Sequence, residues 1–207
     1  MNAAGLVLAA GRSSRMGCDK LALPLADGSS LAARVLQAAL ASRLDAILVV
    51  GRTKQPPLWL QRAHDAQTAP ERIRYIVCPD ADKGLAHSLR CGIRAAEAVR
   101  SDAALILLGD QPFVKSEHIN TLLERFASNR QADYIAASDQ GKAKPPILLA
   151  RSLFDRLQSL EGDQGAGALI NSSMVQGVRI SMPSHVFLDA DTLEDFDFIS
   201  KKEAEGT

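Results

Sequence analysis

Cysteine and long apolar runs are scarce in this 207-residue sequence, and each scarcity excludes a class of protein. The three cysteines, Cys18, Cys78 and Cys91, are too few and too scattered for a disulfide framework or a Cys-x-x-Cys metal site. We therefore expect reduced thiols and a cytoplasmic protein. The apolar runs fall short of the about 20 residues that span a bilayer, which predicts no membrane partner.

Aromatic side chains and net charge are also lacking. Phe, Trp and Tyr make up 4% of the residues, which argues against a stacking platform for single-stranded nucleic acid. The 24 Lys and Arg residues are balanced by 24 Asp and Glu residues, so bulk attraction to a polyanion is excluded as well. We expect no nucleic-acid partner, whereas a small local phosphate site stays compatible with zero net charge.

The sequence does contain a regular alternation of apolar runs and amphipathic stretches. Four mostly apolar runs of strand length predict strands buried on both faces: Gly5–Ala10, Ala46–Gly51, Ile73–Cys78 and Ala104–Gly109. Helical stripes lie between or after them: Leu31–Leu40 behind Ser29 and Ser30, Leu85–Ala96, and Ile119–Phe126 behind a Ser116 cap. This order predicts an α/β fold with a mostly parallel sheet and helices on both faces.

The pattern loosens after about residue 130. Strands are expected at Tyr134–Ser138 and Ile147–Ala150, on either side of the turn-rich segment GKAKPP. Helices are expected at Arg151–Leu160, Gly165–Asn171 and Thr192–Ile199, the last opening with a Thr192-x-x-Asp195 capping pattern. Because the sequence contains neither an internal repeat nor a linker, we expect residues 1–207 to form one domain.

Ligands of open parallel sheets bind beyond the carboxyl ends of the strands, so the residues after each predicted strand are the candidate site. The first strand is followed by glycines, serines and cations: Gly11, Arg12, Ser13, Arg15 and Lys20. Successive N–H groups of such a loop form an anion-binding nest, and the cations can neutralise a polyphosphate. The spacing matches neither the Rossmann fingerprint nor a Walker A loop, and a solvated turn is the simpler structural interpretation.

Three further segments carry chemistry. Asp110 follows the most apolar strand, where a carboxylate suits a Mg²⁺ shared with substrate phosphates, although an Asp before a proline also forms turns. Ser88 lies near the start of a predicted helix at the mouth of the sheet, where its hydroxyl could read a base or ribose. Asp189 and Asp191 precede the last helix and could supply a second metal ligand.

Together these segments resemble the MobA-like nucleotidyltransferases, the family that includes molybdenum cofactor cytidylyltransferase. LAAGRSSRMGCDK is similar to the family's long LAAGxSxRxGxxK signature, and GLAHSLRCGI, LLGDQPFV, EGDQGAGALI and DADTLEDF resemble further family segments. The resemblance runs from about Gly5 to Phe196. The sequence departs from the family pattern at Lys144, Gly167 and Leu193, the first two in the half expected to bind the acceptor.

The resemblance implies a Rossmann-like enzyme that transfers a nucleoside monophosphate from an NTP to a phosphorylated acceptor, with CTP and molybdopterin favoured and pyrophosphate released. It implies a nucleotide-binding half over about residues 1–115 and an acceptor-binding half over about 116–207. Its implied nucleotide-binding residues are Leu8, Ala9, Ala10, Gly11, Arg12, Ser13, Lys20 and Ser88. Arg15, Lys20 and Asp110 are the implied catalytic residues, and Asp110 with Asp191, or less securely Asp189, would bind Mg²⁺.

Other functions stay open at this point. The same chemistry could use GTP with molybdopterin, or an NTP with a sugar or polyol phosphate. A function of another class is a nucleotide-binding accessory protein for molybdoenzyme maturation, and a client molybdoenzyme is a conceivable partner in either case. Binding of nucleotide without release of pyrophosphate would favour the accessory protein.

Overall fold

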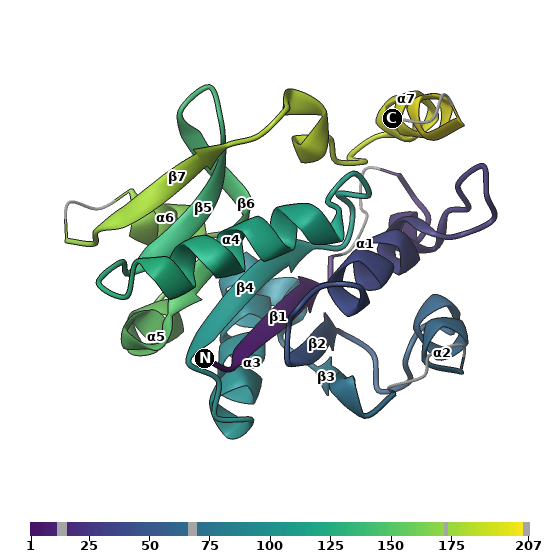
Figure 1. The fold of residues 1–207 in the computed structure, drawn as a ribbon. Coiled ribbons are helices and arrows are strands. Elements are labelled where there is room, and N and C mark those ends of the chain that lie inside the picture. The colour runs from purple at the N-terminus through teal and green to yellow at the C-terminus, as the bar shows by residue number, and fades with distance from the viewer. Residues whose placement is uncertain (12–15, 66–69, 172–173, 205–207) are drawn as a thin grey trace.

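A computed structural model of the chain describes residues 1–11, 16–65, 70–171 and 174–204. The described residues form a seven-stranded sheet in the order β3-β2-β1-β4-β6-β5-β7 (Figure 1). The strands are β1 (Ala3–Leu8), β2 (Ala46–Gly51), β3 (Ile73–Val77), β4 (Ala103–Leu108), β5 (Tyr134–Asp139), β6 (Lys142–Ala150) and β7 (Gly177–Ser181). The α-helices are α1 (Leu31–Leu40), α2 (Leu58–Asp65), α3 (Leu85–Ala98), α4 (Ser116–Ser128), α5 (Phe154–Gln158), α6 (Ala166–Ile170) and α7 (Leu193–Ala204). Short 3-10 helices are η1 (Lys20–Ala22), η2 (Pro70–Arg72), η3 (Ala81–Lys83), η4 (Arg151–Leu153) and η5 (Ser184–Phe187).

The sheet is mostly parallel, as the sequence predicts. β1 pairs in parallel with both β2 and β4, β2 with β3, and β5 with β7. β6 alone among the described strands runs antiparallel, between β4 and β5. Consequently β6 begins at the edge of the sheet where its neighbours end, and that edge carries the candidate site.

Apolar side chains fill both faces of the sheet, which confirms the predicted α/β layering. One cluster joins the sheet to α1, α2 and α4 through residues such as Val35, Trp59 and Leu122. The other joins the opposite face to α3, α5 and α6 through residues such as Leu89 and Phe154. Because the central strands are covered on both sides, their continuous apolar sequences are explained.

A third, smaller cluster anchors α7. Ile199 of this helix is fully buried together with Leu31 at the start of α1 and Phe113 in the loop after β4. Ala190, in the segment just before α7, is fully buried in the same cluster. The helix α7 is therefore anchored beside the start of α1 and the loop after β4 (Figure 1).

Several element boundaries differ from the sequence prediction. The first strand is Ala3–Leu8 rather than Gly5–Ala10, although the Ala9 N–H still donates to the Val50 carbonyl at 2.9 Å. Ser116 is the first residue of α4 and not its cap; the cap is Lys115, whose backbone N–H donates to His118 Nδ1 at 3.1 Å. His118 thus makes the second contact of a capping box, in which a side chain three residues into the helix accepts from the N–H of the cap residue.

The GKAKPP segment is mainly strand rather than turn. Only Gln140 and Gly141 make the reversal, both with positive φ, and Lys142–Pro146 already belong to β6. The prolines cannot donate ladder hydrogen bonds, and the register between β5 and β6 shifts opposite them, between Ala136 and Ala137. This irregularity lets two prolines lie inside the sheet.

α2 and β7 were not predicted from the sequence pattern.

Among the described residues, none of the helices combines the length and apolar character that crossing a bilayer requires. All three cysteines are unpaired: Cys18 is exposed, Cys78 is buried and Cys91 is partly buried.

Candidate functional site

A cavity of about 550 Å³ opens at the carboxyl ends of β1 and β4. Its lining includes four residues predicted from the first strand and the loop behind it: Leu8, Ala10, Gly11 and Lys20. Four more come from distant parts of the sequence: Ser88, Asp110, Asp189 and Asp191. The fold therefore gathers these predicted side chains in one place.

Not every predicted residue lies there. Ala9 faces a neighbouring cavity of about 400 Å³, which shares Gly11 and Leu21 with the first. The backbone N–H of Ala9 is bonded to β2, so it is not available to a ligand. Arg12, Ser13 and Arg15 lie outside the described residues.

Close packing of β1 against β4 places Asp110. The Gly109 N–H donates to the Leu8 carbonyl at 3.1 Å, which extends the β1–β4 pairing one residue past the end of β4. A Cβ at position 109 would lie 3.1 Å from the same carbonyl oxygen, a tight contact that a glycine avoids. The glycine thus brings the following carboxylate directly beside the end of β1.

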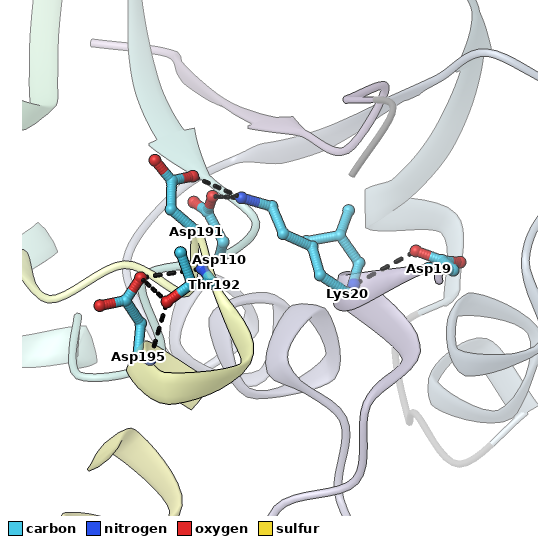
Figure 2. Close-up of polar contacts among 7 residues, drawn as sticks. Asp19, Lys20, Asp110, Asp191, Thr192 and Asp195 are labelled. Atoms are coloured by element: carbon cyan, nitrogen blue, oxygen red, sulfur yellow. Dashed lines mark hydrogen bonds and ion pairs between the residues drawn. The ribbon is translucent and has the colours of Figure 1, made fainter. Parts of the chain in front are cut away.

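Lys20 bridges two of the carboxylates (Figure 2). Its Nζ lies 2.6 Å from Asp110 Oδ2 and 3.1 Å from Asp191 Oδ1. The side chains of Lys20 and Asp110 are 13% and 16% exposed, whereas that of Asp191 is 47% exposed. The ammonium is therefore shielded from solvent on the Asp110 side and approachable from the Asp191 side.

Local structure fixes the lysine. Asp19 caps η1 by accepting a hydrogen bond from the Leu21 N–H at 3.2 Å, and the Leu21 side chain is buried. A lysine held between a cap and a buried leucine has little backbone freedom, so its side chain leaves η1 in a set direction.

The start of α7 fixes Asp191. Thr192 and Asp195 form the reciprocal capping contacts that the sequence predicts: Asp195 Oδ2 accepts from the Thr192 N–H at 2.8 Å, and Thr192 Oγ1 accepts from the Asp195 N–H at 3.1 Å (Figure 2). Ala190, on the other side of Asp191, is fully buried. The carboxylate is thus carried by a segment secured at both neighbours.

The electrostatics of the cavity favour a cation. Burial lowers the pKa of Lys20, but the charges and hydrogen bonds of Asp110 and Asp191 outweigh it, so the net pKa lies above the ordinary value of 10.5. Asp189 shows the opposite imbalance: burial, together with the charges of Asp110 and Asp191, raises its pKa above 3.8. Among the described residues that line the cavity, negative charge is in excess even with the lysine present.

This donor set fits a divalent metal of the kind shared with phosphates. Within the described ranges, no group of three or more His, Cys, Asp or Glu side chains forms a complete metal site. Mg²⁺ commonly takes one or two carboxylates and completes its shell with water and substrate phosphates. Asp110 and Asp191, which meet at one ammonium, supply that number of carboxylates.

The opposite wall of the cavity is the start of α3. Ser88 is 5% exposed and lines the cavity. Gly84, just before the helix, has φ +121° and ψ 170°, a conformation that side chains rarely adopt. A Cβ there would lie 2.3 Å from the Gly162 carbonyl oxygen, and that oxygen accepts the otherwise orphaned Ala86 N–H at 3.0 Å.

This junction explains two lining residues that the sequence prediction missed. Asp163 follows Gly162 into the cavity, and Asp82 precedes Gly84. Asp163 lies within the EGDQG stretch, so its segment was noticed but its contact with the first half of the chain was not. Nothing local in the sequence links Gly162 to Gly84, because 78 residues separate them.

Comparison with known proteins matches the chain to a family. A family model described as the MobA-like NTP transferase domain matches residues 5–178. Purine catabolism protein PucB of Bacillus subtilis is 36% identical over 200 residues, which cover 95% of each chain. A probable molybdenum cofactor guanylyltransferase of Mycobacterium avium is 28% identical over 190 residues, covering 91% of this chain and 89% of the relative. The crystal structure of a homologue of Mycobacterium tuberculosis Rv0371c, from Mycobacterium sp. strain JC1, superposes with a TM-score of 0.80 at 26% identity, covering 98% of this chain and 97% of that one.

Proposed function

Since this chain belongs to the MobA-like NTP transferase family and is a nucleotidyltransferase, we propose that it transfers CMP from CTP to the phosphate of molybdopterin cofactor, with release of pyrophosphate. The observation that carries the proposal is the meeting of Lys20, Asp110 and Asp191 in a cavity that Ser88 also lines. A triphosphate with a divalent metal needs a cation and carboxylates side by side, and this cavity offers both.

The reaction needs no protein nucleophile. A phosphate oxygen of the acceptor attacks the α-phosphorus of CTP, a new P–O bond forms, and the bond to the β-phosphate oxygen breaks as pyrophosphate leaves. Catalysis then consists of positioning and charge neutralisation. Lys20 neutralises phosphate charge, and Arg15, which lies outside the described residues, is proposed to do the same.

The other nucleotide contacts follow the same plan. Leu8, Ala10 and Gly11 border the phosphates, and Ser88 offers its hydroxyl to the base or ribose. Arg12 and Ser13 belong to the proposed set as well. So does Ala9, whose N–H is bonded to β2 and which would therefore contact the nucleotide through its side chain, from the neighbouring cavity. Asp110 and Asp191 would hold Mg²⁺, and Asp189 is the alternative to Asp191 as the second ligand. When bound, the metal supplies positive charge to the phosphates.

The proposal extends to the whole chain. Residues 1–207 act as one domain, with nucleotide bound mainly by residues 1–115 and acceptor mainly by residues 116–207. The cysteines, all unpaired, are compatible with the proposed cytoplasmic location.

The base and the acceptor are tested together by pyrophosphate release. CTP, GTP, ATP and UTP are each mixed with the protein, Mg²⁺ and molybdopterin, and CTP is expected to give the fastest release. Faster release with GTP would instead assign a guanylyltransferase, an alternative favoured by the guanylyltransferase relative.

Two further outcomes separate the remaining functions. Release with a sugar or polyol phosphate, but not with molybdopterin, would reassign the acceptor. Tight nucleotide binding without release from any NTP would favour an accessory protein in molybdoenzyme maturation, for which a client molybdoenzyme is the natural partner.

A further inference from the structure

The ammonium of Lys20 lies where a cation is best held by the two carboxylates. Nζ contacts Asp110 Oδ2 at 2.6 Å and Asp191 Oδ1 at 3.1 Å, so it is held between two carboxylates, one from the middle of the sequence and one from its last part (Figure 2). Both carboxylate oxygens point at a single nitrogen, which is the arrangement that a small hard cation also requires. The lysine and a divalent metal therefore make overlapping demands on the same oxygens.

The lysine also has another anion to bind. Its side chain lines the cavity together with Gly11, at the start of the glycine-rich loop where the triphosphate is proposed to lie. Bound phosphates offer the ammonium several charged oxygens in exchange for two carboxylates. Lys20 can thus bind two kinds of anion within one cavity: the carboxylates of the protein and the phosphates of the substrate.

We propose that Lys20 is a placeholder cation: without nucleotide it occupies the position between Asp110 and Asp191 and competes with divalent metal for it, and bound triphosphate draws it away so that metal enters with the nucleotide. This inference rests on the proposed function, since it assumes a triphosphate in this cavity. It goes beyond that function by setting the order of loading.

The proposal has a consequence for the enzyme before nucleotide binds. An enzyme that held a divalent metal permanently would keep open coordination positions accessible to every cellular anion. With Lys20 in place, part of the carboxylate charge is balanced by a group that cannot diffuse away, and metal affinity stays low until the substrate arrives. Metal and nucleotide binding are therefore positively coupled, and the coupling is reciprocal.

The direct test is a titration with Mn²⁺ alone, in which the electron paramagnetic resonance signal of the free ion reports how much is bound. Lys20→Met removes the competing ammonium, and its Kd for Mn²⁺ is expected to fall by about tenfold or more relative to the wild type, as charge-assisted hydrogen bonds no longer need to be given up. An unchanged Kd would overturn the proposal.

Two matched variants show whether the gain depends on position. Lys144→Met removes the same charge from another lysine–aspartate pair, in which Nζ lies 2.9 Å from Asp139 Oδ2, and its Kd for Mn²⁺ is expected to stay within about twofold of the wild type. Lys20→Arg keeps a cation in place and is expected to bind Mn²⁺ as weakly as the wild type. An equal gain in Lys144→Met would show that only net charge matters and would contradict the proposal.

The location of the gained site is checked by a double variant and by stability. Adding Asp110→Asn to Lys20→Met is expected to abolish the gain. Mn²⁺ is also expected to raise the melting temperature of Lys20→Met more than that of the wild type, because tighter binding to the folded state stabilises it more. A gain that survives the loss of Asp110 would place the ion elsewhere and overturn the proposal.

The exchange itself is tested with a CTP analogue that carries a methylene group between the α- and β-phosphorus and cannot be cleaved. After correction for Mn²⁺ chelated by free analogue, the analogue is expected to raise Mn²⁺ affinity more in the wild type than in Lys20→Met. Equal increases would contradict the exchange. If Lys20→Met binds Mn²⁺ more tightly but the wild type releases no pyrophosphate from any NTP, the placeholder role is upheld and the proposed function is refuted. If the wild type releases pyrophosphate but Lys20→Met binds Mn²⁺ no more tightly, only the placeholder role is refuted.

Discussion

The Lys20 ammonium lies 2.6 Å from the Asp110 carboxylate, although 90 residues separate the two in the chain. The contact joins the 3-10 helix behind β1 to the loop behind β4, and β1 and β4 are adjacent in the sheet. The pair therefore depends on the parallel pairing of these strands, which brings both carboxyl ends to the same edge.

Asp110→Asn is expected to lower the rate of pyrophosphate release by about 10²-fold or more, because a neutral amide neither holds a divalent metal as well nor orients Lys20. The measurement is the steady-state rate with saturating NTP. Asp27→Asn serves as the control: Asp27 pairs with Arg34 at 2.8 Å on the surface, and its loss is expected to leave the rate within about twofold of the wild type. Near-normal turnover in Asp110→Asn would contradict the site assignment.

Gly84→Ala is expected to lower the free energy of unfolding by about 3 kcal/mol, since the new Cβ meets the Gly162 carbonyl and the backbone conformation is strained. Urea denaturation measures the loss. Gly28→Ala separates the two causes, because Gly28 also has positive φ (+78°) but no atom lies within 4 Å of the position that a Cβ would take. The expected loss there is about 1 kcal/mol. Equal losses would mean that the contact with Gly162 contributes nothing.

Ile199→Ala is expected to cost about 2–4 kcal/mol of stability, because Ile199 is fully buried in the cluster that anchors α7. Loosening α7 also loosens Asp191, so a drop in the rate of pyrophosphate release should accompany the lower melting temperature. Phe198→Ala is the matched control on the same helix: the Phe198 side chain is 56% exposed, and a change within about 0.5 kcal/mol is expected. A large loss in the control would place the anchor on the wrong face.

The stability of the protein is expected to fall as the pH drops from 6.5, in part through His118. Burial lowers the pKa of this histidine below 6.5, so the unfolded chain binds a proton that the folded chain resists. The contribution of His118 is thus complete above 6.5 and declines as the pH falls toward the lowered pKa. His118→Gln keeps an acceptor for the Lys115 N–H and removes the titration, so its unfolding free energy should vary less with pH across this range. Identical pH profiles of the two proteins would refute this role.

The sequence predicts best what local pattern encodes. Strands such as Ala46–Gly51 and Ala103–Leu108 are buried on both faces and read as unbroken apolar runs, and α1 has both its stripe and its Ser30 cap. β7 escapes prediction because it is a five-residue edge strand whose residues alternate between exposed and half-buried. α2 escapes because it is short and follows two prolines.

For the site, the difference lies in long-range contacts. Lys20, Ser88 and Asp110 each follow a strand or begin a helix, so the rule for parallel sheets places them at one edge without a structure. Gly84 allows the Gly162 carbonyl to approach closely, and this contact brings Asp163 to the cavity. The contact spans 78 residues, and no local pattern encodes it. That Lys20 and Asp191 touch follows only once α7 is seen anchored beside the start of α1.

The two ion pairs of Lys20 also have a consequence for how the protein folds. They close loops of 90 and 171 residues, and contacts of such sequence separation are entropically costly until the sheet has already brought their partners together. We therefore expect these contacts to form after the rate-limiting step of folding. Substitutions at Asp110 or Asp191 should then change the rate of unfolding and leave the rate of refolding nearly untouched.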